Sequence, residues 1–172
     1  MNLHYSDFEL FGLPQRFAQD QGAIAERWKQ LQREAHPDRF AAQGASAQRA
    51  ALQWSVRINE AYQRLKDPLK RASYLCELLG APIEAHSNTA MPPDFLMEQI
   101  EWREALDEAQ AEDELEELSE RVTQRRREML AQIGQLLDLE ADPPAAAQQV
   151  RALMFIERFA HDIESRLAQL GQ

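Results

Sequence analysis

The apolar positions of this chain recur every three or four residues over long stretches, with polar and charged residues between them. This period places the apolar side chains along one face of an α-helix. No stretch shows the alternation of apolar and polar residues that is typical of a β-strand. Only 6 of the 172 residues are glycine, and good helix formers such as alanine, leucine and glutamate are abundant. The pattern therefore predicts an all-α fold.

Two long apolar stripes dominate residues 1–80, and a segment rich in small residues connects them. We expect this connection, residues 40–46, to be a loop with Ser46 as the N-cap of the second helix. Two such stripes joined by a loop pack most simply as an antiparallel helical hairpin. The stripes are Ile24, Trp28, Leu31 and Ala35 in the first helix, and Ala47, Ala51, Trp54, Ile58, Ala61, Tyr62 and Leu65 in the second.

Capping signals predict where the other helices of this half begin. Ser6 and Glu9 have the spacing of a capping box, so a short helix should start after Ser6. Asp20 is an N-cap candidate for the first long helix. Asp67 followed by Pro68 opens a fourth helix, because proline is favoured at the first helical position. The first half is thus predicted to be a hairpin with short flanking helices.

Residues 81–93 contain many turn-forming residues and almost no charge, so we interpret them as a linker between two modules. Three amphipathic helices are expected in residues 94–172, with a break near residues 111–113 and a cap at Asp142. Short connections between three such helices predict a three-helix bundle. Its expected core positions are Phe95, Trp102, Leu106 and Ala109, then Leu115, Leu118, Val122, Met129, Ile133 and Leu136, and finally Val150, Leu153, Ile156, Phe159, Ala160, Ile163 and Leu167.

The net charge of −10 is distributed unevenly. Residues 1–80 carry 9 acidic and 11 basic residues, a net charge of +2, whereas residues 81–172 carry 20 and 8, a net charge of −12. Opposite signs indicate two modules with different partners, and the acidic half would repel the phosphates of nucleic acid. No apolar run approaches the roughly 18 residues that a membrane span needs, and the N-terminus lacks a signal-peptide pattern. We therefore expect a cytoplasmic protein.

The most informative local feature is His36-Pro37-Asp38, at the end of the first long stripe. Proline disfavours α geometry at the residue before it, so the helix should end near His36. His36 and Asp38 then lie on an exposed bend, where the carboxylate of Asp38 can accept a bidentate arginine from a partner. Alone, the tripeptide is also compatible with an ordinary turn. The basic residues of the preceding helix, which would steer an acidic partner, are Arg27, Lys29 and Arg33.

Residues 1–80 resemble the J-domain of DnaJ-type co-chaperones. The matching features are the basic helix, His36-Pro37-Asp38, the segment after it, residues 58–65, and Asp67-Pro68 with Arg71 and Tyr74. Ala35 and Arg39 depart from the tyrosine and lysine of many J-domains, but neither alters the tripeptide. Residues 95–104 are very similar to the start of the C-terminal bundle in the HscB family, the J-type co-chaperones of bacterial iron–sulfur cluster assembly. This resemblance spans nearly the whole chain.

The resemblance implies a bacterial co-chaperone with two binding surfaces, no enzymatic activity and no cofactor. The J-domain would bind HscA, a specialised DnaK-type chaperone, and stimulate its ATPase through His36-Pro37-Asp38 and the basic helix. The C-terminal bundle would bind the cluster scaffold IscU and deliver it to that chaperone.

An excess of apolar residues marks the start of the expected bundle. Leu96, Met97 and Ile100 lie beside the core stripe that begins at Phe95, so they either widen the core or form an exposed surface. The resemblance favours the exposed surface, because HscB-like proteins hold the scaffold with this helix. The other residues assigned to it are Glu101, Arg103 and Glu104 around the patch, and Phe155, which lies off the inward stripe of the third helix.

Other functions remain open on the sequence. A general J-protein would share the first module and bring a different client. An enzyme would use His36 and Asp38 as acid–base groups or metal ligands, which requires further converging polar residues. Residues 101–120 hold ten acidic residues, but no histidine accompanies them at ligand spacing, so a solvated helical hairpin is a simpler interpretation than a metal site. The single cysteine, Cys76, excludes an intrachain disulfide, and its apolar neighbours indicate burial.

Overall fold

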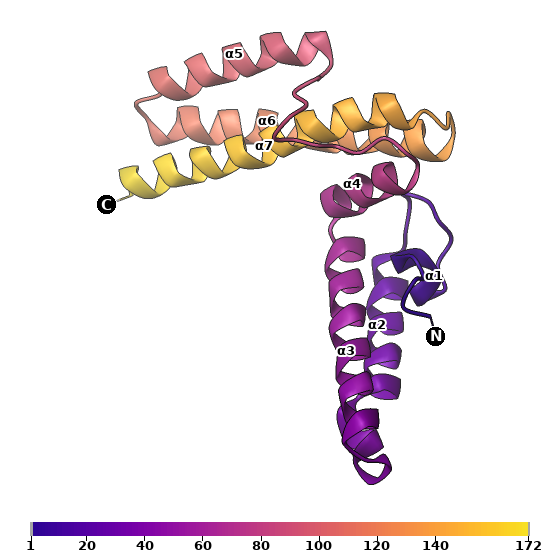
Figure 1. Ribbon diagram of the computed structural model, residues 1–172. Coiled ribbons are helices and arrows are strands. Elements are labelled where there is room, and N and C mark those ends of the chain that lie inside the picture. The colour runs from indigo at the N-terminus through magenta and orange to yellow at the C-terminus, as the bar shows by residue number, and fades with distance from the viewer. Residues whose placement is uncertain (1, 172) are drawn as a thin grey trace. The chain divides into compact units, whose positions relative to one another are not determined.

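The computed structural model describes residues 2–171, which form α-helices and one 3₁₀-helix and contain no strand (Figure 1). The predicted all-α fold is therefore confirmed. Contacts divide the chain into two compact units, Met1–Leu75 and Cys76–Gln172. The division falls a few residues before residue 80, where the sequence placed the end of the first module.

The first unit consists of a helical hairpin, a 3₁₀-helix between its two arms, and short helices before and after them (Figure 1). The capping box forms between Ser6 and Glu9, with bonds of 3.0 and 3.1 Å, and Asp20 and Asp67 accept from backbone N–H groups at the starts of their helices. These predicted helix starts are confirmed. The elements are α1 (Asp7–Phe11), α2 (Gln21–Ala35), η1 (Pro37–Gln43), α3 (Ala45–Lys66) and α4 (Pro68–Leu78), and α4 contains the division between the units.

The two arms of the hairpin, α2 and α3, run antiparallel and are joined by polar and aromatic pairs as well as by their apolar faces. Trp28 stacks on Tyr62 with ring centroids 4.7 Å apart, and its indole N–H donates to Asn59 at 2.9 Å. One turn further along α2, Gln32 accepts a bond of 2.9 Å from the hydroxyl of Ser55. Later residues of α2 therefore contact earlier residues of α3, which confirms the predicted antiparallel hairpin.

The connection between α2 and α3 is not the loop that the sequence predicted. Pro37 begins η1 directly after α2, and the N–H of Asp38 donates to Nδ1 of His36 at 3.2 Å. Proline has its φ angle preset for a helical first turn, so the chain enters a new helix instead of a loop. Gly44, with φ of 96°, then occupies the N-cap position of α3, which places Ser46 inside the helix rather than at its cap.

The second unit contains α5 (Pro93–Glu108), α6 (Glu112–Asp138) and α7 (Pro143–Leu170) (Figure 1). The predicted core stripes are buried, with small differences at their ends. Leu137 is buried in place of Leu136, because it follows Ile133 by four residues and so lies on the same side of α6. Ala160 and Leu167 on α7 are half-buried.

Aromatic side chains attach α5 to α7. Phe95 meets both Trp102 and Phe155 edge-on, with ring centroids 5.8 and 5.7 Å apart. Phe159 stacks on Trp102 and on Phe155 at 5.7 and 5.8 Å. Pairs of this kind contribute about 0.5–1.5 kcal/mol each beyond the burial of their area. The cluster therefore fixes the face of α5 that remains exposed.

Arginines complete the attachment of α5 and compensate part of the acidic charge. Nε of Arg125 on α6 lies 3.0 Å from both carboxylate oxygens of Glu98, and Arg166 on α7 donates to the carbonyl oxygen of Ala109 at 3.0 Å. The second bond satisfies a carbonyl at the C-terminal end of α5 that has no partner within the helix. Both ends of α5 are thus held by side chains of the other two helices.

The segment before α5, which the sequence predicted to be a linker, packs against α7. Arg151 on α7 is buried and donates to the carbonyl oxygens of Ile83, Ala90 and Pro82 at 2.9, 3.1 and 3.4 Å. The side chain of Ile83 is buried as well. The buried guanidinium of Arg151 therefore ties residues 81–92 to α7 within the second unit.

Candidate functional site

The first candidate surface is the bend at His36-Pro37-Asp38, where α2 ends and η1 begins. His36 has an extended conformation, with φ of −63° and ψ of 130°, as expected for a residue before proline. The Asp38 side chain is 92% exposed, and its Oδ2 lies 3.6 Å from Nδ1 of His36. Within residues 2–171, no arginine or lysine forms an ion pair with Asp38. The carboxylate is therefore held on a defined bend and open to solvent.

The three basic residues predicted beside this bend have different environments. Lys29 is exposed and lies 3.7 Å from Glu26, and Arg33 is exposed as well. Arg27 is half-buried, and its Nε donates to the carbonyl oxygen of Phe11 at 3.1 Å. Arg27 thus holds the end of α1 as well as adding positive charge, whereas Lys29 and Arg33 project from α2.

The second candidate surface is the outer face of α5. Leu96, Met97 and Ile100 are 48, 61 and 55% exposed, whereas Phe95 and Trp102 are buried. The three side chains therefore do not widen the core, and they form an apolar patch on the surface of the second unit. Apolar side chains gathered in this way are typical of partner-binding surfaces.

Three charged residues follow this patch along α5. Glu101 and Glu104 are exposed. Arg103 lies 3.5 Å from Asp162 on α7, and its guanidinium lies 5.2 Å from the centroid of the Phe159 ring. Arg103 is therefore oriented by α7, whereas within residues 2–171 neither glutamate forms an ion pair with a neighbouring helix.

Phe155 is half-buried, because it belongs to the aromatic cluster as well as to the surface. Its exposed part lines a surface hollow of about 540 Å³ at the junction of α5 and α7. Arg103 and Phe159 line the same hollow. The structure thus brings Phe155 and Arg103 together, two residues that the sequence assigned to one surface from different helices.

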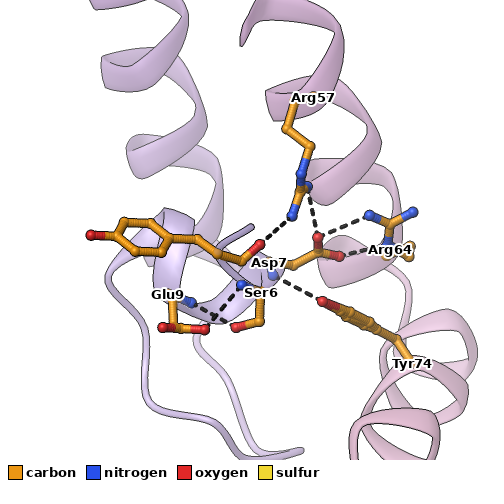
Figure 2. Close-up of polar contacts among 7 residues, drawn as sticks. Ser6, Asp7, Glu9, Arg57, Arg64 and Tyr74 are labelled. Atoms are coloured by element: carbon orange, nitrogen blue, oxygen red, sulfur yellow. Dashed lines mark hydrogen bonds and ion pairs between the residues drawn. The ribbon is translucent and has the colours of Figure 1, made fainter. Parts of the chain in front are cut away.

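Sequence reasoning missed a buried ionic cluster around Asp7 (Figure 2). The carboxylate of Asp7 is fully buried and accepts from Arg57 at 2.8 Å and from Arg64 at 2.6 and 2.9 Å. The backbone N–H of Asp7 donates to the hydroxyl of Tyr74 at 3.0 Å. The cluster therefore joins α1, α3 and α4 within the first unit. The available signal was the seven-residue spacing of Arg57 and Arg64, which places both on one side of α3.

The ionic cluster also shifts the pKa values of Arg64 and Tyr74. The hydrogen bond to Asp7 raises the pKa of Arg64 above its ordinary value. Burial raises the pKa of Tyr74, although its bond to the backbone of Asp7 acts in the opposite direction. Arg64 also lies over the Tyr74 ring, 5.1 Å from its centroid. At neutral pH, Arg64 therefore stays protonated and Tyr74 stays neutral.

The relatives of this chain are co-chaperones. The co-chaperone protein HscB homolog of Azoarcus sp. (strain BH72) is 47% identical over 173 residues, which cover 99% of this chain and 98% of the relative. The chain belongs to the HscB co-chaperone family. The family model of the HSCB C-terminal oligomerisation domain matches residues 91–164, which include α5, α6 and most of α7. The resemblance drawn from the sequence is therefore confirmed.

Two solved structures of HscB proteins share the fold. The chaperone HscB from Vibrio cholerae is 39% identical, with a TM-score of 0.81 over 96% of this chain and 99% of that protein. The human co-chaperone protein HscB is 25% identical, with a TM-score of 0.88 over 96% of this chain and 84% of that protein. The first unit is accordingly an N-terminal J-domain, and the second is the C-terminal helical domain. Membership of this family makes the chain a co-chaperone and not an enzyme.

The sequence offered two further candidate sites, Cys76 and the acidic residues 101–120. Cys76 is buried, and burial raises the pKa of its thiol to about 11, so the thiol is protonated at neutral pH. Across residues 2–171, no group of three or more His, Cys, Asp or Glu side chains is arranged to hold a metal ion. No helix in the same part of the chain is long and apolar enough to cross a membrane.

Proposed function

We propose that this protein couples the iron–sulfur scaffold IscU to the DnaK-type chaperone HscA in the bacterial cytoplasm. Its J-domain stimulates the ATPase of HscA, and its C-terminal domain binds IscU and delivers it. The observation that supports this most directly is the presence of two exposed surfaces of different chemistry, one on each unit of a chain from the HscB family.

The chaperone-binding surface is His36, Pro37 and Asp38 with the basic residues of α2. The exposed carboxylate of Asp38 accepts a bidentate hydrogen bond from an arginine of the chaperone, which fixes orientation as well as adding charge attraction. Lys29 and Arg33 approach an acidic area of the same partner and accelerate the encounter. Arg27 contributes mainly through its charge, since its Nε is bonded to Phe11.

The scaffold-binding surface is the apolar patch of α5 with its charged rim. Leu96, Met97 and Ile100 supply the apolar contacts, because each has about half of its surface available for burial. The rim and the neighbouring helix supply the polar and aromatic contacts that select the partner. Those residues are Glu101, Arg103, Glu104 and Phe155.

The test is the steady-state ATPase rate of HscA, measured with this protein, with IscU, and with both together. We expect each addition alone to stimulate weakly and the two together to stimulate far more than the sum, because the protein brings both to one complex. A rate with both proteins that equals the rate with this protein alone would contradict the scaffold role. It would favour a general J-protein with another client. The absence of any stimulation by the protein would contradict the J-domain role.

A further inference from the structure

Arg151 is a buried cation that no carboxylate of residues 2–171 neutralises. Its side chain is 6% exposed, and within residues 2–171 its guanidinium donates to three backbone carbonyls of the segment before α5. Within residues 2–171 it forms no ion pair. Carbonyl dipoles satisfy N–H groups, but they do not cancel a whole charge, so a buried guanidinium in this setting favours an anion nearby. A guanidinium has five N–H groups, and these bonds use three of them.

A second arginine without an ion pair lies seven residues further along the same side of α7. Arg158 is exposed, and the part of the chain that the structure describes supplies no carboxylate within ion-pair distance of it. Arg151 and Arg158 line one pocket of about 80 Å³. Two uncompensated positive charges at one pocket are unusual in a unit whose residues 81–172 carry a net charge of −12.

The remaining lining of this pocket supplies donors and lowers the local polarity. Asn88 and Thr89 lie on the segment that Arg151 anchors, and both line the pocket. The Oδ1 atom of Asn88 accepts from the N–H of Ala90 at 3.0 Å, which leaves its amide nitrogen as a donor. Met91 and Met154 form apolar walls, and charge attraction is stronger beside such walls than in water.

We propose that this pocket binds a phosphate-type oxyanion. Two guanidinium groups, an amide and a hydroxyl offer donors from both α7 and the preceding segment, which matches an anion whose acceptor oxygens point in several directions. The pocket has room for a small ion but not for a nucleotide. A bound anion neutralises Arg151 and bridges the segment before α5 to α7. This site does not include Leu96, Met97 or Ile100, although Arg158 also lines the neighbouring hollow of Arg103 and Phe155. Phosphate binding here does not depend on the proposed scaffold binding.

The test is a titration of the full-length protein with inorganic phosphate, followed by the amide NMR signals of Asn88 and Thr89 at constant ionic strength. We expect saturable shifts at these signals with phosphate and none with an equal ionic strength of chloride. Arg158→Gln should weaken phosphate binding about tenfold or more, because it removes one charge-assisted contact. Arg158 is exposed, so this variant should keep the fold, which the signals of α5 and α6 verify.

Arg127→Gln is the matched control, because it removes the same charge as Arg158→Gln. Arg127 is exposed on α6 and does not line the pocket. This variant should bind phosphate within about twofold of the wild type. The proposal is overturned if wild-type shifts are absent, do not saturate or appear equally with chloride. It is also overturned if Arg127→Gln weakens binding as much as Arg158→Gln, because the effect would then come from net charge alone.

Discussion

Arg64 holds Asp7 through two hydrogen bonds, with Nε 2.6 Å from Oδ2 and Nη2 2.9 Å from Oδ1 (Figure 2). Arg57 adds a third bond to the same carboxylate at 2.8 Å and donates a further one to the carbonyl oxygen of Tyr5. A fully buried carboxylate is tolerated only because these partners surround it. The short helix α1 is thereby fastened to the long arm α3, although its five residues are too few to be stable alone.

Asp7→Asn should lower the free energy of unfolding of the J-domain by about 3 kcal/mol, because it leaves two arginines facing a neutral amide. Urea unfolding followed by NMR signals of α1 and α3 measures the change. Glu26→Gln is the control, since its pair with Lys29 is exposed and should contribute less than about 0.5 kcal/mol. Equal midpoints for Asp7→Asn and the wild type would show that the cluster does not stabilise the fold.

Asp38→Asn should abolish stimulation of the HscA ATPase while leaving the fold intact. The side chain is 92% exposed, so removing its charge should change the free energy of unfolding by less than about 0.5 kcal/mol. The amide cannot accept two hydrogen bonds from an arginine in the way a carboxylate does. The matched control is Asp113→Asn, an exposed aspartate on α6. Wild-type ATPase stimulation by Asp38→Asn would refute the role of this carboxylate.

Replacing Leu96, Met97 and Ile100 together by alanine should weaken IscU binding by about a hundredfold or more, since truncating contact residues commonly costs 1–2 kcal/mol each. Isothermal titration calorimetry measures this affinity. Weak stimulation of HscA in the absence of the scaffold should persist, because the J-domain is unchanged. Leu52→Ala with Val56→Ala is the control, since these two apolar residues are similarly exposed but lie on α3. Unchanged scaffold affinity in the triple variant would place the interface elsewhere.

Stability should fall between pH 9 and pH 11 because of Cys76. Burial raises the pKa of its thiol from 9.0 to about 11, so above pH 9 the unfolded chain releases a proton that the folded chain retains. This stabilisation is complete below pH 9 and is lost as the pH rises, by about 2–3 kcal/mol in total. Cys76→Ala should flatten the decline in urea unfolding across this range. Tyr74, whose pKa burial also raises, remains in both proteins, so the difference between the two curves isolates the thiol.

Features that depend on neighbours in the chain were predicted well from the sequence. The caps at Ser6, Asp20 and Asp67 form as expected, because each cap bonds to an amide two or three residues away. Periodicity alone did not predict the exposure of Leu96, Met97 and Ile100, because it also allowed these residues to widen the core. The aromatic contacts that attach α5 to α7 settle it, because they turn the opposite face of α5 inward.

Features that depend on contacts between distant residues were not predicted from the sequence. Asp7 looked like an ordinary member of a capping box, and only the packing of α1 beside α3 brings Arg57 and Arg64 to it. Nothing in the sequence singled out Arg151, which the fold buries against the segment before α5. A long charged side chain gives no sign of its partner, since the partners are 50 or more positions apart in both clusters.

The sequence by itself determined the helices, their buried stripes and the family. The reason is that helical period, capping and short motifs depend only on residues close together in the chain. The tertiary structure alone decided which side chains at the two surfaces are available to partners. It exposes the patch at Leu96, turns Nε of Arg27 toward Phe11, and buries Arg151 beside a pocket. The physical reason is that exposure depends on which helix packs against which face, and that choice is made by contacts between residues far apart in the chain.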